Sequence, residues 1–230
     1  MRKMKKLTLL VALLSITMLG RAQSQPEYRM EVGAGVGTVA YQGDFNTSIT
    51  KGMQPTLSAH MRYIFNPYTA LHLAGTFGKL KGSSDNYDTY YPNYQNTKYE
   101  FNNSLVDVSA TFEYNFWPYG TGRDYRGAKR LTPYLLLGIG TTAVKTENKS
   151  VFTANLPLGV GVKYKLADRL NLAVQWVAHF SLSDELDGVK DPYMVTSKGM
   201  FKNTDTYTVL QLSLTYSFWA KCKVCHNQDE

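Results

Sequence analysis

The sequence has no long apolar run after its first 22 residues, and this absence excludes a membrane-spanning helix in that region. Even the apolar run near the start, residues 7–19, has only 13 residues, whereas a spanning helix needs about 20. Cysteine is also scarce: the chain has two, Cys222 and Cys225, and neither follows a signal peptide. We therefore do not expect a lipoprotein.

The first 22 residues have the composition of a secretory signal peptide. A basic head comes first, the apolar run follows, and Gly20 and Ala22 supply the small residues that a signal peptidase recognises. We therefore expect residues 1–22 to be cleaved from an exported protein.

Basic charge is not in excess once this segment is removed. Five of the 25 basic residues lie within residues 1–22, which leaves 20 basic against 18 acidic residues and a net charge of +2. A basic surface that could hold nucleic acid is therefore not expected. The roughly 200 remaining residues are enough for one domain.

What the sequence does have is alternation of apolar and polar residues. The alternation recurs in eight runs of about ten residues, the length that a tilted strand needs to cross a bilayer. In the clearest run, Leu172, Val174 and Trp176 share one face, and Asn171 and Gln175 share the other. The runs cover residues 30–38, 57–63, 70–79, 106–116, 133–144, 156–165, 170–180 and 210–218. We predict an all-β fold, an eight-stranded antiparallel transmembrane outer-membrane β-barrel formed by residues 23–220.

Two of these runs carry further information. Residues 30–38 place Gly33, Gly35 and Gly37 on one face, which we expect to point inward because a small barrel leaves little room for side chains. Residues 133–144 are nearly all apolar, so their pattern does not indicate which side faces inward.

The connections between the runs alternate in length. The tight turns are residues 66–69 and 167–169, and the longer polar segments are residues 40–54, 80–104, 145–153 and 181–206. Short periplasmic turns and longer extracellular loops are typical of outer-membrane barrels with both termini in the periplasm. One connection departs from this pattern: residues 117–130 should be periplasmic, yet they number 14 and are basic.

A soluble β-sandwich is the competing fold, because its strands also alternate. Aromatic residues near the strand ends favour the barrel, since such residues gather where a membrane meets water. These residues are Tyr63, Phe65, Tyr68, Phe116, Trp117, Tyr164, Phe218 and Trp219.

If the polar faces point inward, five charged residues meet inside the barrel. They are Glu31, Arg62, Asp107, Glu113 and Lys163. A carboxylate pair could do acid–base chemistry, but charges inside a closed barrel need partners. We therefore expect them to pair with one another and fill the interior.

A second set of reactive residues lies where the run 170–180 should emerge from the membrane. His179, Ser181, Ser183, Asp184 and Glu185 could belong to an enzyme that acts on lipid or peptide. Because a nucleophile, its base and the orienting group normally come from different elements, neighbours in sequence are weak evidence. We predict no catalytic residues and no enzyme.

Residues 221–230 form a short tail that contains Cys222, Cys225 and His226. The pattern C-x-x-C-H is that of c-type haem attachment, but only four residues follow the histidine. A zinc site normally has four ligands, and the motif offers three. In an oxidising compartment a local disulfide or a docking tail fits better, so no cofactor is predicted.

Several short segments along the chain form a recognisable series. They are AYQGDF at 40–45, FNPYTAL at 65–71, YNFWPYG at 114–120, TPYL at 132–135, GIG at 138–140, LPLGVG at 156–161 and SDELDGV at 183–189. Taken together, these segments resemble the PorG family of outer-membrane barrels in the type IX secretion system. The resemblance extends along most of the exported chain.

This resemblance implies a non-catalytic component that contacts a periplasmic ring formed by PorK and PorN. Outer-membrane lipids are the other expected partner. The periplasmic surface would then include the connection 117–130 and the tail, and the candidate contact residues are Arg123, Arg126, Lys129, Arg130, Cys222, Cys225 and His226.

Two other functions remain open. One is a small outer-membrane enzyme that acts on lipid or peptide. The other is a structural or adhesive barrel that binds through its tyrosine-rich loop, residues 80–104.

Overall fold

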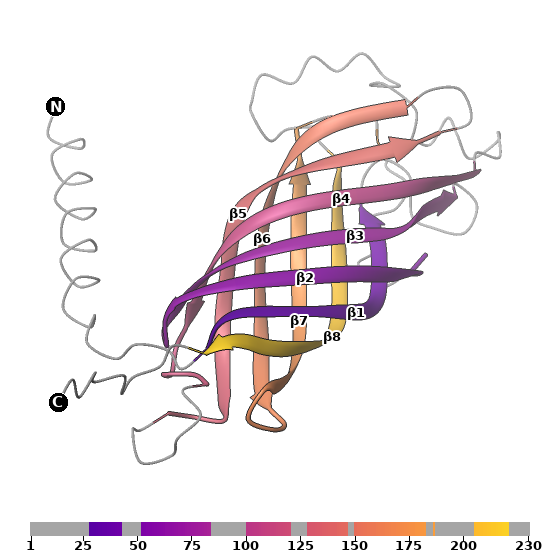
Figure 1. The fold of residues 1–230 in the computed structure, drawn as a ribbon. Helices are drawn as coiled ribbons and strands as arrows, with labels where there is room; N and C mark the ends of the chain where they lie inside the picture. Colours follow the sequence, from indigo (N-terminus) through magenta and orange to yellow (C-terminus); the bar gives the residue numbers. More distant parts are fainter. Residues whose placement is uncertain are drawn as a thin grey trace, which may run out of the picture.

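The computed structural model describes residues 28–42, 52–83, 100–120, 128–146, 150–182, 186 and 205–220. These residues form eight strands: β1 (Tyr28–Gln42), β2 (Gln54–Asn66), β3 (Thr69–Ser83), β4 (Glu100–Asn115), β5 (Leu131–Lys145), β6 (Ser150–Lys165), β7 (Leu170–Ser181) and β8 (Thr206–Ala220). Each strand is antiparallel to its neighbours in sequence, and β1 pairs with β8. The result is a closed barrel (Figure 1).

The predicted eight-stranded antiparallel barrel is therefore confirmed. Seven of the eight predicted runs lie within a strand, and the run 106–116 ends one residue past β4. The strands have 12 to 16 residues, more than the roughly ten needed to cross a bilayer. Pairing continues past the alternating segments, so that Ser83 of β3 still pairs with Glu100 of β4. Hydrophobic alternation reports only the part of a strand that faces lipid, and it misses these extensions.

Closure satisfies the backbone of every strand. The β1–β8 seam runs in register from Tyr28 opposite Ala220 to Gln42 opposite Thr206. Since lipid offers no hydrogen-bond partners, a membrane-spanning sheet must have no open edge. The soluble β-sandwich, which would leave edges, is excluded.

The faces of the strands are also arranged as predicted. Val160, Trp176 and Leu210 lie side by side on β6, β7 and β8, and each is 45–49% exposed. The neighbouring polar residues Gln175 and Gln211 are buried inside. A continuous apolar outer face around a polar interior is the arrangement of a membrane-spanning barrel.

Strand β5 resolves the one run whose facing the sequence left open. Tyr134 and Leu136 point inward and pack with Val177, whereas Leu137 and Ile139 are exposed outside. The alternation is hidden here because apolar side chains occupy both faces.

The glycines expected to face inward do so because the interior is narrow. A Cβ atom added at Gly33 of β1 would lie 2.1 Å from the carbonyl oxygen of Leu214 on β8, and one added at Gly37 would lie 2.1 Å from that of Leu210. No larger residue fits these positions without a shift of the neighbouring backbone.

We distinguish two ends of the barrel. The turn end holds the β2–β3 and β6–β7 turns, the connection between β4 and β5, and the described chain ends Tyr28 and Ala220 (Figure 1). The loop end holds the other connections. Among the described residues, no helix is long and apolar enough to cross a membrane. The expected signal peptide, residues 1–22, and the tail, residues 221–230, lie outside the described residues.

Candidate functional site

Four of the predicted interior charges form one buried cluster near the turn end. The Arg62 guanidinium on β2 donates to Glu113 Oε2 on β4 at 2.9 Å and to Glu31 Oε2 on β1 at 3.2 Å. Lys163 on β6 donates to the other oxygen of Glu113. Two cations thus face two carboxylates, and all four side chains are buried. The predicted pairing is confirmed, and it leaves no carboxylate pair available for acid–base chemistry in this cluster.

Asp107, the fifth predicted interior charge, lies apart from this cluster. It is six residues from Glu113 along β4, a separation of about 20 Å. Its Oδ2 atom accepts hydrogen bonds from Asn155 at 2.6 Å, Tyr207 at 2.8 Å and Thr142 at 3.1 Å. His179 Nδ1 also lies 3.8 Å from this oxygen. The sequence places Asp107 on the inner face, but it does not reveal that these residues, and not Arg62 or Lys163, lie beside it.

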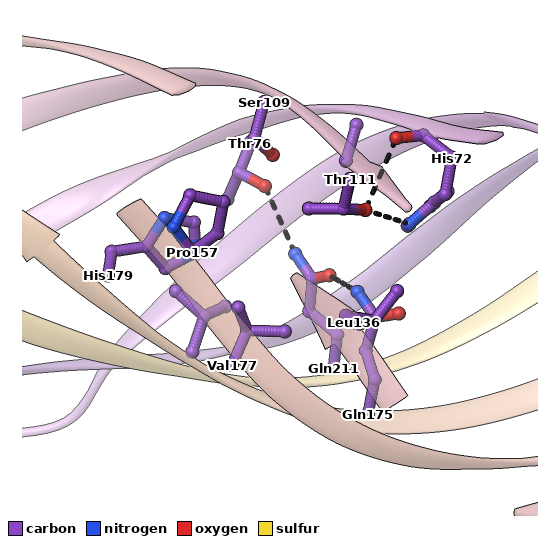
Figure 2. A pocket seen from close by; sticks show the side chains of 12 residues that line it. His72, Thr76, Ser109, Thr111, Leu136, Pro157, Gln175, Val177, His179 and Gln211 are labelled. Carbon is purple, nitrogen blue, oxygen red and sulfur yellow. Dashed lines mark hydrogen bonds between the residues drawn. The ribbon is translucent and has the colours of Figure 1, made fainter. Parts of the chain in front are cut away.

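The middle of the barrel is filled by polar side chains around one small cavity (Figure 2). Gln175 donates to Gln211 at 2.9 Å, and Gln211 donates to Thr76 at 3.2 Å. The cavity volume is about 20 Å³, enough for one water molecule. Among the described residues, no three His, Cys, Asp or Glu side chains are placed to hold a metal ion.

The loop end is closed by an apolar plug that the sequence did not reveal. Leu186, from the connection between β7 and β8, is fully buried. Its backbone N–H donates to Asp205 Oδ2 at 2.8 Å, and its carbonyl oxygen accepts from Asn103 at 3.0 Å. It packs in a cluster of inward-facing residues, which are Val39, Tyr41, Leu80, Phe101, Leu105, Val144, Tyr207 and Val209.

The reactive residues near the end of β7 do not form an open site where the structure describes them. His179 is buried, and its ring stacks on that of Tyr207 with 4.6 Å between the centroids. Ser181 is also buried. Ser183, Asp184 and Glu185 lie outside the described residues.

The long connection between β4 and β5 is anchored across the turn end. The N–H of Trp117 donates to the Thr132 hydroxyl at 3.0 Å, and the N–H of Tyr119 donates to the carbonyl of Pro67, in the β2–β3 turn, at 3.1 Å. On the returning segment, the Lys129 N–H donates to Pro118 at 2.7 Å. The two ends of the connection therefore lie side by side.

Tyr119 fixes this connection to the barrel interior. Its ring is buried, and its hydroxyl donates to Asn171 Oδ1 on β7 at 2.9 Å. The Lys163 ammonium lies 5.0 Å from the ring centroid, within the range of a cation–π contact. Burial raises the pKa of the Tyr119 phenol, so its hydroxyl remains a donor. The connection 117–130 contains three aromatic residues, Trp117, Tyr119 and Tyr125, so the sequence alone does not single out Tyr119 as the anchor.

Two of the predicted contact residues can be placed. Lys129 and Arg130 are exposed at the turn end, where Arg130 also accepts a backbone hydrogen bond from Lys165 at 2.7 Å. The remaining five, Arg123, Arg126, Cys222, Cys225 and His226, lie outside the described residues.

Closed topology, a lipid-compatible outer face and a filled interior define an outer-membrane β-barrel. The chain belongs to the family described as "Domain of unknown function (DUF6089)", whose profile matches residues 5–227. No curated protein matches the sequence.

Solved structures share the barrel fold at low sequence identity. Neisserial surface protein A (NspA) is 15% identical with a TM-score of 0.50, over 82% of this chain and 97% of that one. OprG from Pseudomonas aeruginosa is 12% identical with a TM-score of 0.49, over 86% and 99%. Ail from Yersinia pestis is 14% identical with a TM-score of 0.42, over 84% and 99%. At these identities the similarity to NspA shows the fold alone.

Proposed function

We propose that this protein is a non-catalytic outer-membrane component of the type IX protein secretion system. Both termini lie in the periplasm, and the turn end contacts the periplasmic ring of PorK and PorN. The resemblance of the sequence motifs to the PorG family suggests that the protein belongs to this secretion system. The observation that carries the contact surface is the anchored, basic connection between β4 and β5.

The anchoring supports a role in docking. A flexible loop loses conformational entropy when it binds a partner, whereas a loop that is already fixed loses less of it. Tyr119 holds one end of the connection to β7, and the Lys129 N–H bonds to Pro118. The cations Lys129 and Arg130 are thus presented from a fixed base beneath the barrel.

The filled interior favours a role as an anchor and argues against a role as a pore. Buried charges occupy the turn end of the barrel, polar side chains occupy the middle, and the apolar plug occupies the loop end. The cavity of about 20 Å³ is far too small for a secreted polypeptide. Cargo must therefore cross elsewhere, and this barrel serves to hold machinery at the membrane.

The test is co-purification of the ring with variants of the connection. Lys129→Gln/Arg130→Gln, combined with replacement of residues 121–127 by a Gly-Ser segment of equal length, should abolish recovery of PorK and PorN from detergent-solubilised membranes. Tyr119 is retained, so the connection stays anchored to β7. The matched control is Lys79→Gln/Lys81→Gln, which removes two exposed cations at the loop end.

The control should recover the ring in the normal amount and support secretion of cargo proteins. Normal recovery with the turn-end variant would show that this connection is not the contact surface. A strain that lacks the gene but still secretes its cargo would exclude the type IX role itself.

A further inference from the structure

An exposed arginine is held in a fixed position where the barrel closes. Arg169, in the turn between β6 and β7, donates through Nε to the Tyr28 hydroxyl at 3.3 Å and through Nη1 to the Tyr216 hydroxyl at 3.1 Å. Its guanidinium carbon also lies 5.3 Å from the centroid of the Tyr28 ring. The two tyrosines come from β1 and β8, on either side of the seam.

The backbone beneath this side chain is fixed as well. The Ser217 N–H on β8 donates to the Arg169 carbonyl at 2.7 Å. Within the turn, Leu170 and Ala167 exchange backbone hydrogen bonds, each 3.2 Å long. An arginine on a free turn would sample many rotamers, but here both the backbone and the guanidinium are ordered before any ligand arrives, and this lowers the entropy cost of binding.

The charge of Arg169 is not neutralised by its partners. Both are phenols, and no described carboxylate lies within ion-pair distance of the guanidinium. A guanidinium has five N–H donors in a planar fork that matches the oxygens of a phosphate. Two of these nitrogens contact the phenols, which leaves Nη2 and the open side of the fork to an anion.

The surface next to Arg169 is suited to a lipid chain. Leu172 on β7, Leu214 on β8 and Ala34 on β1 lie in one row. The row nearer the turn end contains Leu170, Tyr216 and Val32, of which Tyr216 is 45% and Val32 49% exposed. This strip leads from the guanidinium onto the lipid-facing side of the barrel. A ligand with a phosphate at one end and acyl chains at the other matches both parts.

We propose that Arg169, clamped by Tyr28 and Tyr216, is a binding site for the phosphate of an anionic membrane lipid at the turn end of the barrel. The site is specific, in contrast to the general solvation of the outer face by lipid. It does not depend on the proposed role in secretion, because it lies on the lipid-facing side of the β7–β8–β1 seam.

The experiment is a titration of the purified, detergent-solubilised protein with short-chain phosphatidylglycerol, followed by native mass spectrometry. Diacylglycerol of the same chain length tests whether the phosphate is needed, and inorganic phosphate tests whether the chains are needed. The variants are Arg169→Gln, Arg169→Lys and Tyr28→Phe/Tyr216→Phe, with Arg130→Gln as the control for an exposed cation at the same end. A difference in gel mobility between boiled and unboiled samples verifies that each variant is folded.

Arg169→Gln should weaken phosphatidylglycerol binding about tenfold, as expected for loss of a charged hydrogen-bonding group. Tyr28→Phe/Tyr216→Phe keeps both rings and the charge, so it tests the clamp without disturbing the fold. It should weaken binding about threefold, and Arg169→Lys should weaken it although the charge remains. Arg130→Gln should leave binding unchanged.

Several outcomes would overturn the proposal. Equal losses with Arg130→Gln and Arg169→Gln would indicate surface charge alone. Wild-type binding by both Arg169→Lys and the double phenylalanine variant would show that the clamp has no role. Equal affinity for diacylglycerol, or complete competition by inorganic phosphate at the same concentration as the lipid, would exclude a lipid phosphate as the ligand.

Discussion

At the scale of single residues, Glu113 is the centre of the charged cluster. It accepts hydrogen bonds from both Arg62 and Lys163, and it is completely buried. The other carboxylate, Glu31, contacts only one of the two cations, Arg62. Loss of the Glu113 charge therefore leaves the buried Lys163 ammonium without its carboxylate partner, whereas Arg62 keeps Glu31.

We predict that Glu113→Gln destabilises the barrel by about 3–5 kcal/mol, because an uncompensated charge remains buried. The free energy would be measured by urea-induced unfolding in detergent, followed by tryptophan fluorescence. Asp168→Asn, at an exposed position in the β6–β7 turn, is the control and should change little.

The double variant Glu113→Gln/Lys163→Met should be more stable than Glu113→Gln alone, since it restores the balance of one cation and one carboxylate. If the single and double variants unfold at the same urea concentration, charge pairing is not what stabilises this end of the interior.

The sequence predicts the position of such residues better than their partners. Alternation alone places Glu31, Arg62, Asp107, Glu113 and Lys163 on inner faces, and all five are there. Which of them meet depends on the stagger between strands, and the sequence does not specify it. For this reason the sequence does not predict that Arg62 and Lys163 both lie beside Glu113 and that neither lies beside Asp107. The sequence does not predict the clamp around Arg169 either, because Tyr28 and Tyr216 are far from Arg169 in sequence and only the strand pairing brings them together.

At the scale of elements, one residue folds into the barrel at each end: Leu186 at the loop end and Tyr119 at the turn end. Both residues come from connections, and both are buried against strands. Connections carry little periodicity, so the sequence indicates their length and charge but not the residue that folds inward. The trace of an apolar plug in the sequence pattern is that apolar residues, such as Tyr41, Phe101 and Leu105, replace polar ones on the inner face near the strand ends.

We predict that Leu186→Ala loosens the connection between β7 and β8, because removing most of a buried leucine side chain costs about 2–5 kcal/mol. The connection should be cleaved faster by protease in the folded, detergent-solubilised protein. Leu182→Ala is the matched control, since Leu182 lies at the start of the same connection but is 51% exposed. Equal cleavage rates in the two variants would argue against a plug held by Leu186.

At the scale of the whole molecule, the closed barrel follows directly from the sequence. Eight alternating runs, short turns that alternate with long connections, and the absence of a spanning helix together leave few other folds. The basic connection 117–130 also stands out from its length alone. The orientation of the barrel in the membrane is a prediction of the same pattern.

This orientation can be tested with single cysteines in a Cys222→Ser/Cys225→Ser background. Lys81→Cys at the loop end should react with a membrane-impermeant thiol reagent on intact cells, because that end faces outward. Lys129→Cys at the turn end should react only after the outer membrane is permeabilised. The reverse result would place the termini outside the cell and remove the basis for contact with a periplasmic ring.

The interior cluster has a consequence for how the barrel is assembled. Glu31 lies in the first strand, yet it accepts hydrogen bonds from Asn171 on β7 and Thr215 on β8, each at 3.3 Å. In a nascent chain that lacks its last strands, this carboxylate has neither of those donors, and β1 has no β8 to pair with. Arg62 on β2 supplies the opposite charge early, but the remaining donors to the first strand's acid arrive only with the last strands, in the same step that closes the sheet. A chain cut short before β8 is therefore expected to lack both the closed seam and the full set of donors to Glu31.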